Sequence, residues 1–316
     1  MTLKKLKVCF VGIGSIAKRH IKNLTRISFE DGINLSIDAV RRNGNKENDD
    51  IYNLIENVFL SVDALTATYD AIFITNPTEY HLNTLQKVTP YGKNFFVEKP
   101  IVSLLQLEDI KFYKKKIGSV YYVACPLRYN AVIQYVKNNI NIDDVFAVRS
   151  ISSSYLPDWR PGQDYRDTYS AHKSLGGGVS IDLIHEWDYL SYLFGKPTKV
   201  ACMSGKKSNL EIDSEDYAIY IAEYLDKTIE LHLDYFGRKT IRDITLFTKD
   251  DTIVGDIANN KITYLKSGKT IDFHEERDDF QVRELRHFLE MIDGKCAQDS
   301  DINHAIEVLK LTQGVL

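Results

Sequence analysis

The chain has 316 residues, of which 44% are hydrophobic and 27% are charged, and its formal net charge is -4. This length and composition allow a sizeable buried core and suit two domains better than one. The mild acidity argues against nucleic acid or an anionic membrane as the main partner, and no apolar run has the length of a membrane span or a signal sequence.

The spacing of the cysteines bears on the compartment and on metal binding. Cys9, Cys125, Cys202 and Cys296 lie far apart, and none of them belongs to a CxxC pair. Three of the four fall in apolar runs typical of strands, so we expect buried thiols in a reducing compartment. The sequence therefore predicts a soluble cytoplasmic protein without a metal site.

A short apolar run at residues 6–11 is followed directly by GIGSIA and then by a helical pattern of apolar residues. A strand, a glycine turn and a helix in this order are the context that a dinucleotide-binding turn requires. The three small positions allow a tight turn, close approach of the backbone to a pyrophosphate and close packing of the helix. We therefore expect this segment to bind the cofactor through Gly12, Gly14, Ser15, Ile16 and Ala17.

The end of the next predicted strand, residues 35–40, bears on the choice between NAD and NADP. An NAD enzyme places a carboxylate there for the ribose hydroxyls. This chain has Arg41, Arg42 and Asn43 instead, and their donors suit a 2′-phosphate, so we expect NADP. Asp38 lies inside the strand, where alternation points it away from this group, but a shift of one residue in register would restore NAD.

Two further predicted strands, residues 70–75 and 95–97, end in polar turns. Sheets of this kind bind their ligands at the carboxyl ends of parallel strands. The cofactor cleft is therefore expected to include Thr75, Asn76, Pro77, His81, Glu98 and Lys99. The alternative for Lys99 is a solvated turn lysine paired with Glu98.

Residues 119–125 have the pattern of the last strand of this domain, which places a boundary between residues 1–123 and 124–316. Helices are predicted after it at 129–139, 280–292 and 303–311, and strands at 145–153, 199–203, 217–225, 228–236, 242–247, 252–257 and 261–265. The fold class is therefore α/β, with an N-terminal Rossmann dinucleotide-binding domain and a C-terminal α+β domain that has a large, mostly antiparallel open sheet.

A long loop, residues 154–175, is rich in aromatic and charged side chains. Loops of this length are usually functional or disordered, and this one is too aromatic for disorder. Aromatic faces stack on sugar rings, and arginines hold carboxylates or phosphates, so we expect substrate binding by Trp159, Arg160, Tyr165 and Arg166. The alternative is packing aromatics with surface arginines.

The segment 176–195, GGGVSIDLIHEWDYLSYLFG, predicts a glycine turn that runs into one amphipathic helix. Three glycines let the backbone approach a ligand closely. Asp182, His185 and Asp188 follow one another at intervals of three, so neighbouring turns of the helix present carboxylate, imidazole and carboxylate together. A histidine held by a carboxylate is suited to proton transfer. The alternative is a core histidine between two solvated aspartates.

Four motifs, in this order, resemble the Gfo/Idh/MocA oxidoreductase family: GIGSIAKRH, TNPTEYH, the EKP turn and GGGVSIDLIHEWD. The resemblance implies an active-site lysine at Lys99, a catalytic histidine at His185 and a nearby aspartate at Asp182, with Arg128 in a further segment shared with relatives. Many members separate the last two positions by four residues rather than the three found here, so Asp188 is an alternative to Asp182.

The resemblance implies an NAD(P)-dependent dehydrogenase or reductase that acts on a CH-OH group of a sugar, cyclitol or nucleotide sugar, with NADP preferred and NAD possible. The alternatives are a nonenzymatic nucleotide-binding regulator of the same fold, an NAD-dependent glycosidase and a structural role for the nucleotide. Alternation at Ile219, Ile221, Ile229, Leu231 and Leu233 suits a subunit interface as well as a core, so we expect a homodimer or homotetramer through the C-terminal sheet.

Overall fold

The computed structural model describes residues 4–42 and 49–316, and the chain divides into two compact units. The first unit contains Met1–Ala124 and Gln281–Ile306, and the second contains Cys125–Phe280 and Glu307–Leu316. From sequence, everything after residue 123 is expected in the second domain. The structure instead returns residues 281–306 to the first unit.

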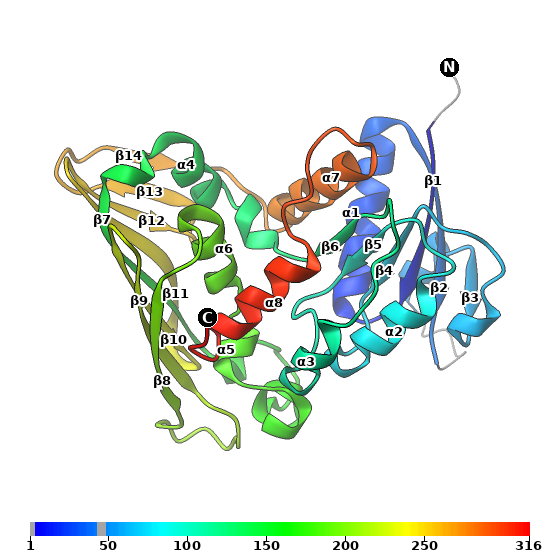
Figure 1. The fold of residues 1–316 in the computed structure, drawn as a ribbon, viewed down its shortest axis with the longest axis horizontal. Helices are drawn as coiled ribbons and strands as arrows, with labels where there is room; N and C mark the ends of the chain where they lie inside the picture. The colour runs from blue at the N-terminus through cyan, green and yellow to red at the C-terminus, as the bar shows by residue number, and fades with distance from the viewer. Residues whose placement is uncertain (1–3, 43–48) are drawn as a thin grey trace. The chain divides into compact units, whose positions relative to one another are not determined.

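The first unit is built on a sheet of six parallel strands in the order β3-β2-β1-β4-β5-β6 (Figure 1). This is the order of a doubly wound dinucleotide-binding sheet, whose direction of winding reverses between β1 and β4. The strands are β1 (Lys4–Val11), β2 (Ile33–Val40), β3 (Asn57–Phe59), β4 (Ala71–Ile74), β5 (Phe95–Val97) and β6 (Tyr121–Val123). The Rossmann fold predicted for this part of the chain is confirmed.

Four helices accompany this sheet: α1 (Ser15–Asp31), α2 (His81–Val88), α3 (Leu107–Ile110) and α7 (Asp279–Ile292). Helix α7 explains why residues 281–306 join the first unit. The ring of Phe288 lies 5.8 Å from that of Phe73 on β4 and 5.3 Å from that of Phe96 on β5. Arg286 of α7 also pairs with Glu30 of α1 at 2.6 Å. The apolar face of α7 is thus buried on the parallel sheet, and no local sequence signal names that sheet as its partner.

The second unit contains an eight-stranded sheet in the order β14-β13-β12-β11-β7-β10-β9-β8. Its strands pair in antiparallel fashion except β7 and β10, which are parallel. This confirms the mostly antiparallel sheet and adds a strand, β14, that the sequence pattern did not predict. The strands are β7 (Val145–Tyr155), β8 (Lys199–Gly205), β9 (Tyr217–Glu223), β10 (Thr228–Asp234), β11 (Phe236–Thr248), β12 (Thr252–Asp256), β13 (Lys261–Tyr264) and β14 (Thr270–Asp272).

The two faces of this sheet differ. Helices α4 (Ala131–Asn139), α5 (Val179–Asp182) and α6 (His185–Phe194) lie on one side of it in Figure 1, and α8 (Ile302–Leu311) ends near the same sheet. Ile229, Leu231 and Leu233 of β10 are buried, whereas Ile219 and Ile221 of β9 are 38% and 58% exposed. The five alternating residues therefore separate into a core face and an open face.

The cysteines do not all behave as the sequence predicts. Cys9 and Cys125 are buried, but Cys202 is exposed on β8 and Cys296 is only half-buried. Within the described residues none of them forms a disulfide. Burial raises the pKa of Cys9, and Asp38 adds to this effect, so the Cys9 thiol stays protonated. The strand-like run around Cys202 lies near the edge of the sheet, where an apolar pattern does not guarantee burial.

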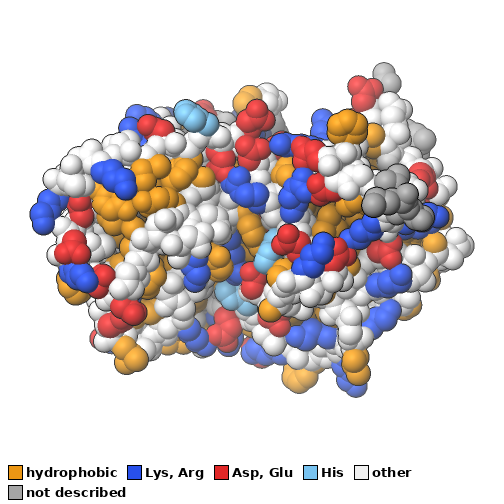
Figure 2. Space-filling model, turned by 90° about the horizontal axis from the view of Figure 1, so that it is seen from above, with side chains coloured by type: hydrophobic (Ala, Val, Ile, Leu, Met, Phe, Trp, Pro, Cys, Tyr) orange, Lys and Arg blue, Asp and Glu red, His pale blue; other side chains and the backbone are white. Residues whose placement is uncertain are grey.

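Two surface properties bear on the partners expected from composition. Acidic and basic side chains are interspersed over the face that Figure 2 shows, and neither sign dominates it. None of the helices in residues 4–42 and 49–316 is long and apolar enough to span a bilayer.

Candidate functional site

The glycine turn after β1 is locked to the turn after β4. The Gly12 amide donates to the Val40 carbonyl at 3.0 Å, and the Thr75 hydroxyl donates to the Gly12 carbonyl at 2.7 Å. Gly12 has a φ of +94°, and a Cβ there would lie 2.7 Å from the Asn76 Cα. Position 12 must therefore be glycine for two reasons, the left-handed backbone and the close approach of the neighbouring turn.

Gly14 has a different environment. A Cβ added at Gly14 would meet no atom within 4 Å, and Gly14 and Ser15 are both exposed. Gly14 caps the 17-residue helix α1, whose first turn contains no acidic residue. Free amides and the positive end of the helix dipole thus face open space, which suits the pyrophosphate of a dinucleotide. Ala17, in the first turn of α1, is buried as its helix-packing role requires.

The carboxylate of Asp38 does not face this space. It is 1% exposed and accepts hydrogen bonds from the Asn57 amide and the Tyr69 hydroxyl, each at 2.8 Å. Strand β2 ends at Val40, so Arg41 and Arg42 are the first residues beyond its carboxyl end. A shift of one residue in the register of β2 would have let Asp38 face a ribose, but the chain does not adopt that register.

The two arginines lie against aromatic rings. Arg41 donates to the Tyr52 hydroxyl, and the Arg42 guanidinium lies 4.8 Å from the centre of the Tyr80 ring. Arg42 is exposed, whereas Arg41 is half-buried. Asn43, the third residue expected at this position, lies outside the described residues.

The turn after β5 is hydrogen-bonded to α1. Glu98 Oε1 lies 2.6 Å from Nε2 of His20, a buried residue that the sequence motifs contain but did not single out. Burial alone would raise the pKa of Glu98, but the hydrogen bond and charge of His20, together with the charges of Lys99 and His81, lower it overall. Lys99 is half-buried, and its backbone amide donates to Glu98 at 3.3 Å. The peptide bond between Lys99 and Pro100 is cis.

His81 supports the turns rather than facing open space. Its side chain is buried, with Nε2 2.8 Å from the Asn76 carbonyl and Nδ1 3.0 Å from the Pro100 carbonyl. Burial lowers the pKa of His81. The ring therefore joins the turn after β4 to the turn after β5, and the expected contact between His81 and the cofactor stays a prediction.

In the second unit the predicted continuous helix is broken. Helix α5 ends at Asp182 and α6 begins at His185, with a turn at Leu183 and Ile184 between them. Asp182 and His185 thus stand at the end of one helix and the start of the next, so the regular spacing of a single α-helix does not by itself fix how their side chains lie. The sequence cannot show this break because the apolar pattern continues through it.

The glycines before α5 pack against the protein itself. A Cβ at Gly177 would collide with the Tyr169 carbonyl and lie 2.8 Å from the Ser170 carbonyl, and one at Gly178 would collide with the Glu215 carboxyl group. The φ angles of Gly176 and Gly178 are +79° and +137°. The interpretation of these glycines as a ligand approach is wrong for Gly177 and Gly178, because their space is filled by the chain.

Asp182 is the centre of a polar cluster in the second unit. The Tyr235 hydroxyl donates to Asp182 Oδ2 at 2.6 Å, and the Tyr169 hydroxyl also bonds this carboxylate. Burial raises the pKa of the Tyr235 phenol, and the charge of Asp182 adds to the effect. The Trp159 ring lies 5.2 Å from the Tyr235 ring, and the Arg160 guanidinium lies 5.5 Å from the Tyr169 ring.

Sequence reasoning missed Tyr169 and Tyr235 as members of this cluster. Tyr169 carried a weak signal, since it is one of several tyrosines in the flagged loop. Tyr235 follows directly after β10 and has no motif of its own. The packing of α5 against β10, the strand that precedes Tyr235, brings Tyr235 to Asp182.

Arg128, which is expected to bind substrate, forms an ion pair inside the second unit. It is 1% exposed and forms a bidentate ion pair with Asp188, with Nε–Oδ2 at 2.8 Å and Nη2–Oδ1 at 2.7 Å. The Tyr192 ring lies 5.1 Å from its guanidinium. A buried pair of this geometry anchors α6 to the segment before α4. Asp188 is therefore engaged with Arg128, which weakens it as an alternative to Asp182.

Tyr165 and Arg166 hold the loop together. Arg166 pairs with Asp164 at 2.6 Å and with Glu211 at 3.3 Å, and the Glu211 amide donates to the Tyr165 hydroxyl at 3.1 Å. The Arg166 side chain is about half exposed. Of the substrate-binding residues expected from sequence, Trp159 and Arg160 are the ones that border the Asp182 cluster.

The predicted site residues are thus distributed over both units. The glycine turn, the ends of β2, β4 and β5, and Lys99 belong to the first unit. Asp182, half-buried His185, Trp159 and Arg160 belong to the second. The first set offers an anion-binding helix terminus, and the second offers an imidazole and a phenol-bonded carboxylate.

Two family models match the chain. The model of the Gfo/Idh/MocA oxidoreductases, an oxidoreductase family with an NAD-binding Rossmann fold, matches residues 6–124. The model of the Gfo/Idh/MocA C-terminal domain matches residues 133–238. Among curated proteins, scyllo-inositol 2-dehydrogenase (NAD(+)) of Bacillus subtilis is 23% identical, over 96% of this chain and 91% of the relative.

Solved structures show the same fold along nearly the whole chain. Levoglucosan dehydrogenase in complex with NADH superposes with a TM-score of 0.84 at 13% identity, covering 99% of this chain and 96% of the other. UDP-N-acetylglucosamine 3-dehydrogenase GnnA from Acidithiobacillus ferrooxidans gives 0.80 at 20% identity, covering 99% and 97%. The WlbA dehydrogenase from Bordetella pertussis, in complex with NADH and UDP-GlcNAcA, gives 0.78 at 18%, covering 99% and 95%.

Proposed function

We propose a function for this chain from the premise that it belongs to the Gfo/Idh/MocA family, and is therefore an oxidoreductase with an NAD-binding Rossmann fold. The proposed reaction is hydride transfer between a nicotinamide cofactor and a secondary alcohol or ketone of a sugar, cyclitol or nucleotide sugar. The observation that carries this proposal is the open space at Gly14. There the exposed N-terminus of α1 follows β1, next to which the direction of winding of the sheet reverses. The named relatives act on substrates of these classes.

NADP is the proposed cofactor. Asp38, the carboxylate nearest the end of β2, is buried and already accepts two hydrogen bonds, so it offers nothing to a ribose. Arg41 and Arg42 follow the end of β2, where two guanidinium groups suit a 2′-phosphate. Similar solved structures contain NADH, so the NADP preference is a property proposed for this chain's own residues.

The cofactor, when bound, supplies the hydride chemistry, and the chain supplies position, charge and proton transfer. His185 takes the hydroxyl proton as the general base, and the Lys99 ammonium polarises the developing oxygen. Asp182 stabilises the charge of His185 from a carboxylate that Tyr235 and Tyr169 hold in place. Trp159 and Arg160, at the edge of this cluster, are the proposed contacts to a sugar ring and to an anionic substituent.

Cofactor choice is tested by titrating the protein with NADPH and NADH while following the fluorescence of Trp159 and Trp187. NADPH is expected to bind at least about tenfold more tightly, which corresponds to about 1.4 kcal/mol. Arg42→Ala should remove most of this preference. The matched control is Arg26→Ala, an exposed arginine that pairs with Glu30 on α1, and it should retain the preference. Equal binding of the two nucleotides would refute the phosphate site, and binding of neither would favour a regulator over an enzyme.

The catalytic assignment is tested by His185→Ala. Turnover with NADP and a responsive sugar should fall about 10²- to 10⁴-fold, the range for loss of a general base, while NADPH affinity is nearly kept. His274→Ala, at an exposed histidine, is the matched control. Unchanged turnover in the His185 variant would remove it from the mechanism.

The open face of the eight-stranded sheet is proposed to pair with a second copy of the chain. Met203 and Ile219 are cross-strand neighbours on β8 and β9, and both are exposed, as is Ile221. Exposed apolar side chains on a sheet face mark a contact surface. Ile221→Glu should shift the protein from dimer or tetramer to monomer in size-exclusion chromatography with light scattering, and a monomeric parent protein would exclude this interface.

A further inference from the structure

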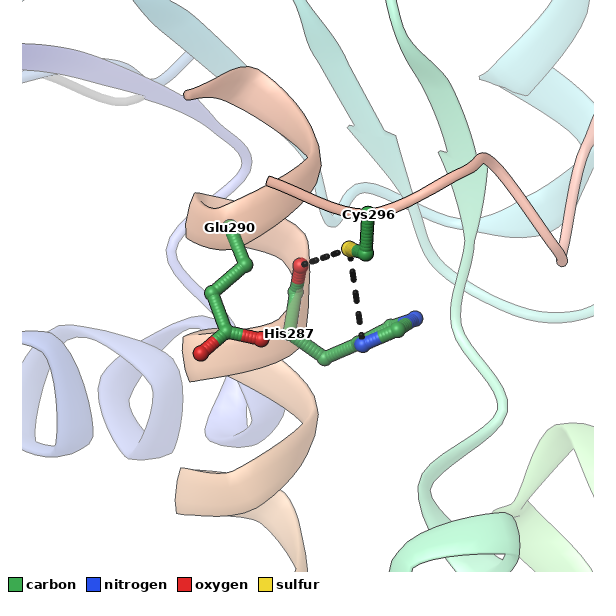
Figure 3. Close-up of side chains that lie close together, drawn as sticks. All are labelled: His287, Glu290 and Cys296. Atoms are coloured by element: carbon green, nitrogen blue, oxygen red, sulfur yellow. Dashed lines mark hydrogen bonds between the residues drawn. The ribbon is translucent and has the colours of Figure 1, made fainter. Parts of the chain in front are cut away.

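A histidine, a glutamate and a cysteine converge outside the proposed catalytic site, in the part of the chain that returns to the first unit. His287 and Glu290 are three residues apart on α7, and Cys296 comes from the loop that follows this helix (Figure 3). One ligand atom from each lies within 4.8 Å of the others. We propose that these three side chains bind a divalent transition metal ion of the zinc class, with the fourth position open to water.

The distances suit this ion. Cys296 Sγ lies 3.8 Å from His287 Nδ1, and sulfur and nitrogen bound to one tetrahedral zinc ion are about 3.6 Å apart, given bonds of about 2.3 and 2.0 Å. Glu290 is exposed, so its carboxylate can close the remaining gap by rotating its side chain. A thiolate, an imidazole and a carboxylate are the ligand types that zinc prefers.

The orientation of His287 matches that of a metal ligand. Its Nε2 lies 3.1 Å from the Asp299 carboxylate, which favours the tautomer with the proton on Nε2. That tautomer leaves a lone pair on Nδ1, the atom that faces the sulfur. A carboxylate that holds the far nitrogen of a ligating histidine is the usual support of such a site, because it fixes the ring and raises its basicity.

The backbone holds the loop in place before any ion binds. Helix α7 ends in a Schellman motif at Gly294, which has a φ of +71°, with Lys295 donating to the Glu290 carbonyl at 2.9 Å and Gly294 to the Met291 carbonyl at 3.0 Å. This reversal carries Cys296 back over the helix. Further on, Ser300 is fixed to β6 by hydrogen bonds with the Val123 backbone, at 2.8 Å each way.

The charges also favour a cation. With Cys296 as the thiol, Glu290 and Asp299 are the anionic groups nearest to it, and Lys295 is drawn to Asp293 at 3.1 Å. A bound metal ion would displace the proton of the Cys296 thiol as the sulfur–metal bond forms. The sequence did not predict this metal site because its cysteines have no CxxC spacing. Two of the proposed ligands come from one face of a helix, and the third comes from the loop after it.

The experiment uses the full chain, stripped of metal by a chelator and titrated with Co²⁺ and Zn²⁺. Co²⁺ is expected to give a thiolate-to-metal absorption band and the visible bands of a tetrahedral ion, both lost when one equivalent of Zn²⁺ is added. Cys296→Ser should abolish the thiolate band, whereas Cys202→Ser, at the exposed cysteine of β8, should leave it intact. Asp299→Asn should weaken Zn²⁺ binding by about 10- to 100-fold, the loss typical when the carboxylate that orients a ligating histidine is removed.

A titration of parent protein without the thiolate band would overturn the proposal, as would a band that disappears equally in the two serine variants. Glu290→Gln provides a readout that does not alter the thiol: the band should persist with weaker binding, and unchanged affinity would exclude Glu290. Metal binding should also raise the melting temperature of the parent protein but not of Cys296→Ser. These readouts require neither substrate nor nicotinamide, so they stand or fall separately from the proposed reaction.

Discussion

The chain contains two glycine turns that each lead into a helix, and the two are alike in sequence but not in environment. A Cβ at Gly14 in the first turn would enter open space beside the N-terminus of α1. In the second turn, a Cβ at Gly177 or Gly178 would strike the Tyr169 carbonyl or the Glu215 carboxyl group. The first turn is therefore suited to a ligand, whereas the second lets two segments of the chain pack closely. A glycine turn before a helix shows that something approaches the backbone, and only the structure tells whether it is a ligand or the protein.

The largest effect expected from this comparison is on stability. Gly177→Ala forces a methyl group against backbone carbonyls that cannot rotate away, so we expect a loss of about 3 kcal/mol in the free energy of unfolding. Urea denaturation followed by circular dichroism measures this loss. If Gly177→Ala unfolds like the parent protein, the packing explanation of the second turn is wrong.

Two matched variants separate the causes of that loss. Gly176→Ala keeps the φ of +79° but meets no atom within 4 Å, so it should lose only the ~1 kcal/mol of a left-handed alanine. Tyr169→Phe removes the hydroxyl that bonds Asp182 and leaves the carbonyl in place, so it should also lose about 1 kcal/mol. A loss in either variant as large as that of Gly177→Ala would contradict the assignment of the strain to the carbonyl contact.

The second expected effect is on binding, with stability retained. Gly14→Ala is compatible with the local φ of -90° and touches nothing, so unfolding should change by less than about 1 kcal/mol. NADPH affinity should nevertheless fall at least about tenfold, or ~1.4 kcal/mol, because the methyl group occupies space that the pyrophosphate needs. Unchanged affinity in a fluorescence titration would show that the open space does not receive the cofactor.

The smallest expected effect concerns the hydrogen bond between His20 and Glu98 beside the first turn. His20 helps to hold the pKa of Glu98 below its ordinary value of 4.5, so the ionised carboxylate stabilises the folded state. This contribution is present above pH 4.5 and is lost as the pH falls through the lower pKa of the folded protein. Above pH 5, Glu98→Gln should therefore be less stable than the parent by about 1 kcal/mol, and the difference should shrink in more acidic solution.

Thermal melts between pH 3 and 7 measure this difference. Glu108→Gln is the matched control, because its carboxylate is largely exposed and pairs only at the surface with Lys111. A pH-independent difference for Glu98→Gln would mean that ionisation of this carboxyl group does not contribute.

The sequence by itself determined most of the elements of the fold and their order. Strand, glycine turn and helix at the start of the first unit, and alternating runs in the second, are local patterns set by backbone geometry and by burial of one face. They predicted the Rossmann sheet, most strands of the antiparallel sheet, and the polar turns after β1, β2, β4 and β5. The chemistry placed at those turns followed from residue types alone.

Only the tertiary structure decided which groups face open space and which face the chain. Asp38 accepts hydrogen bonds from Asn57 and Tyr69, and Arg128 pairs with Asp188. These partners lie 19 to 60 residues away in the sequence. Helix α7 belongs to the second half of the sequence but packs on the first unit, because its apolar face contacts Phe73 and Phe96. The convergence of His287, Glu290 and Cys296 has the same origin. Contacts between residues so far apart in the sequence depend on packing of the whole unit. The local periodicity of a strand (two residues) or a helix (3.6 residues) therefore does not predict them.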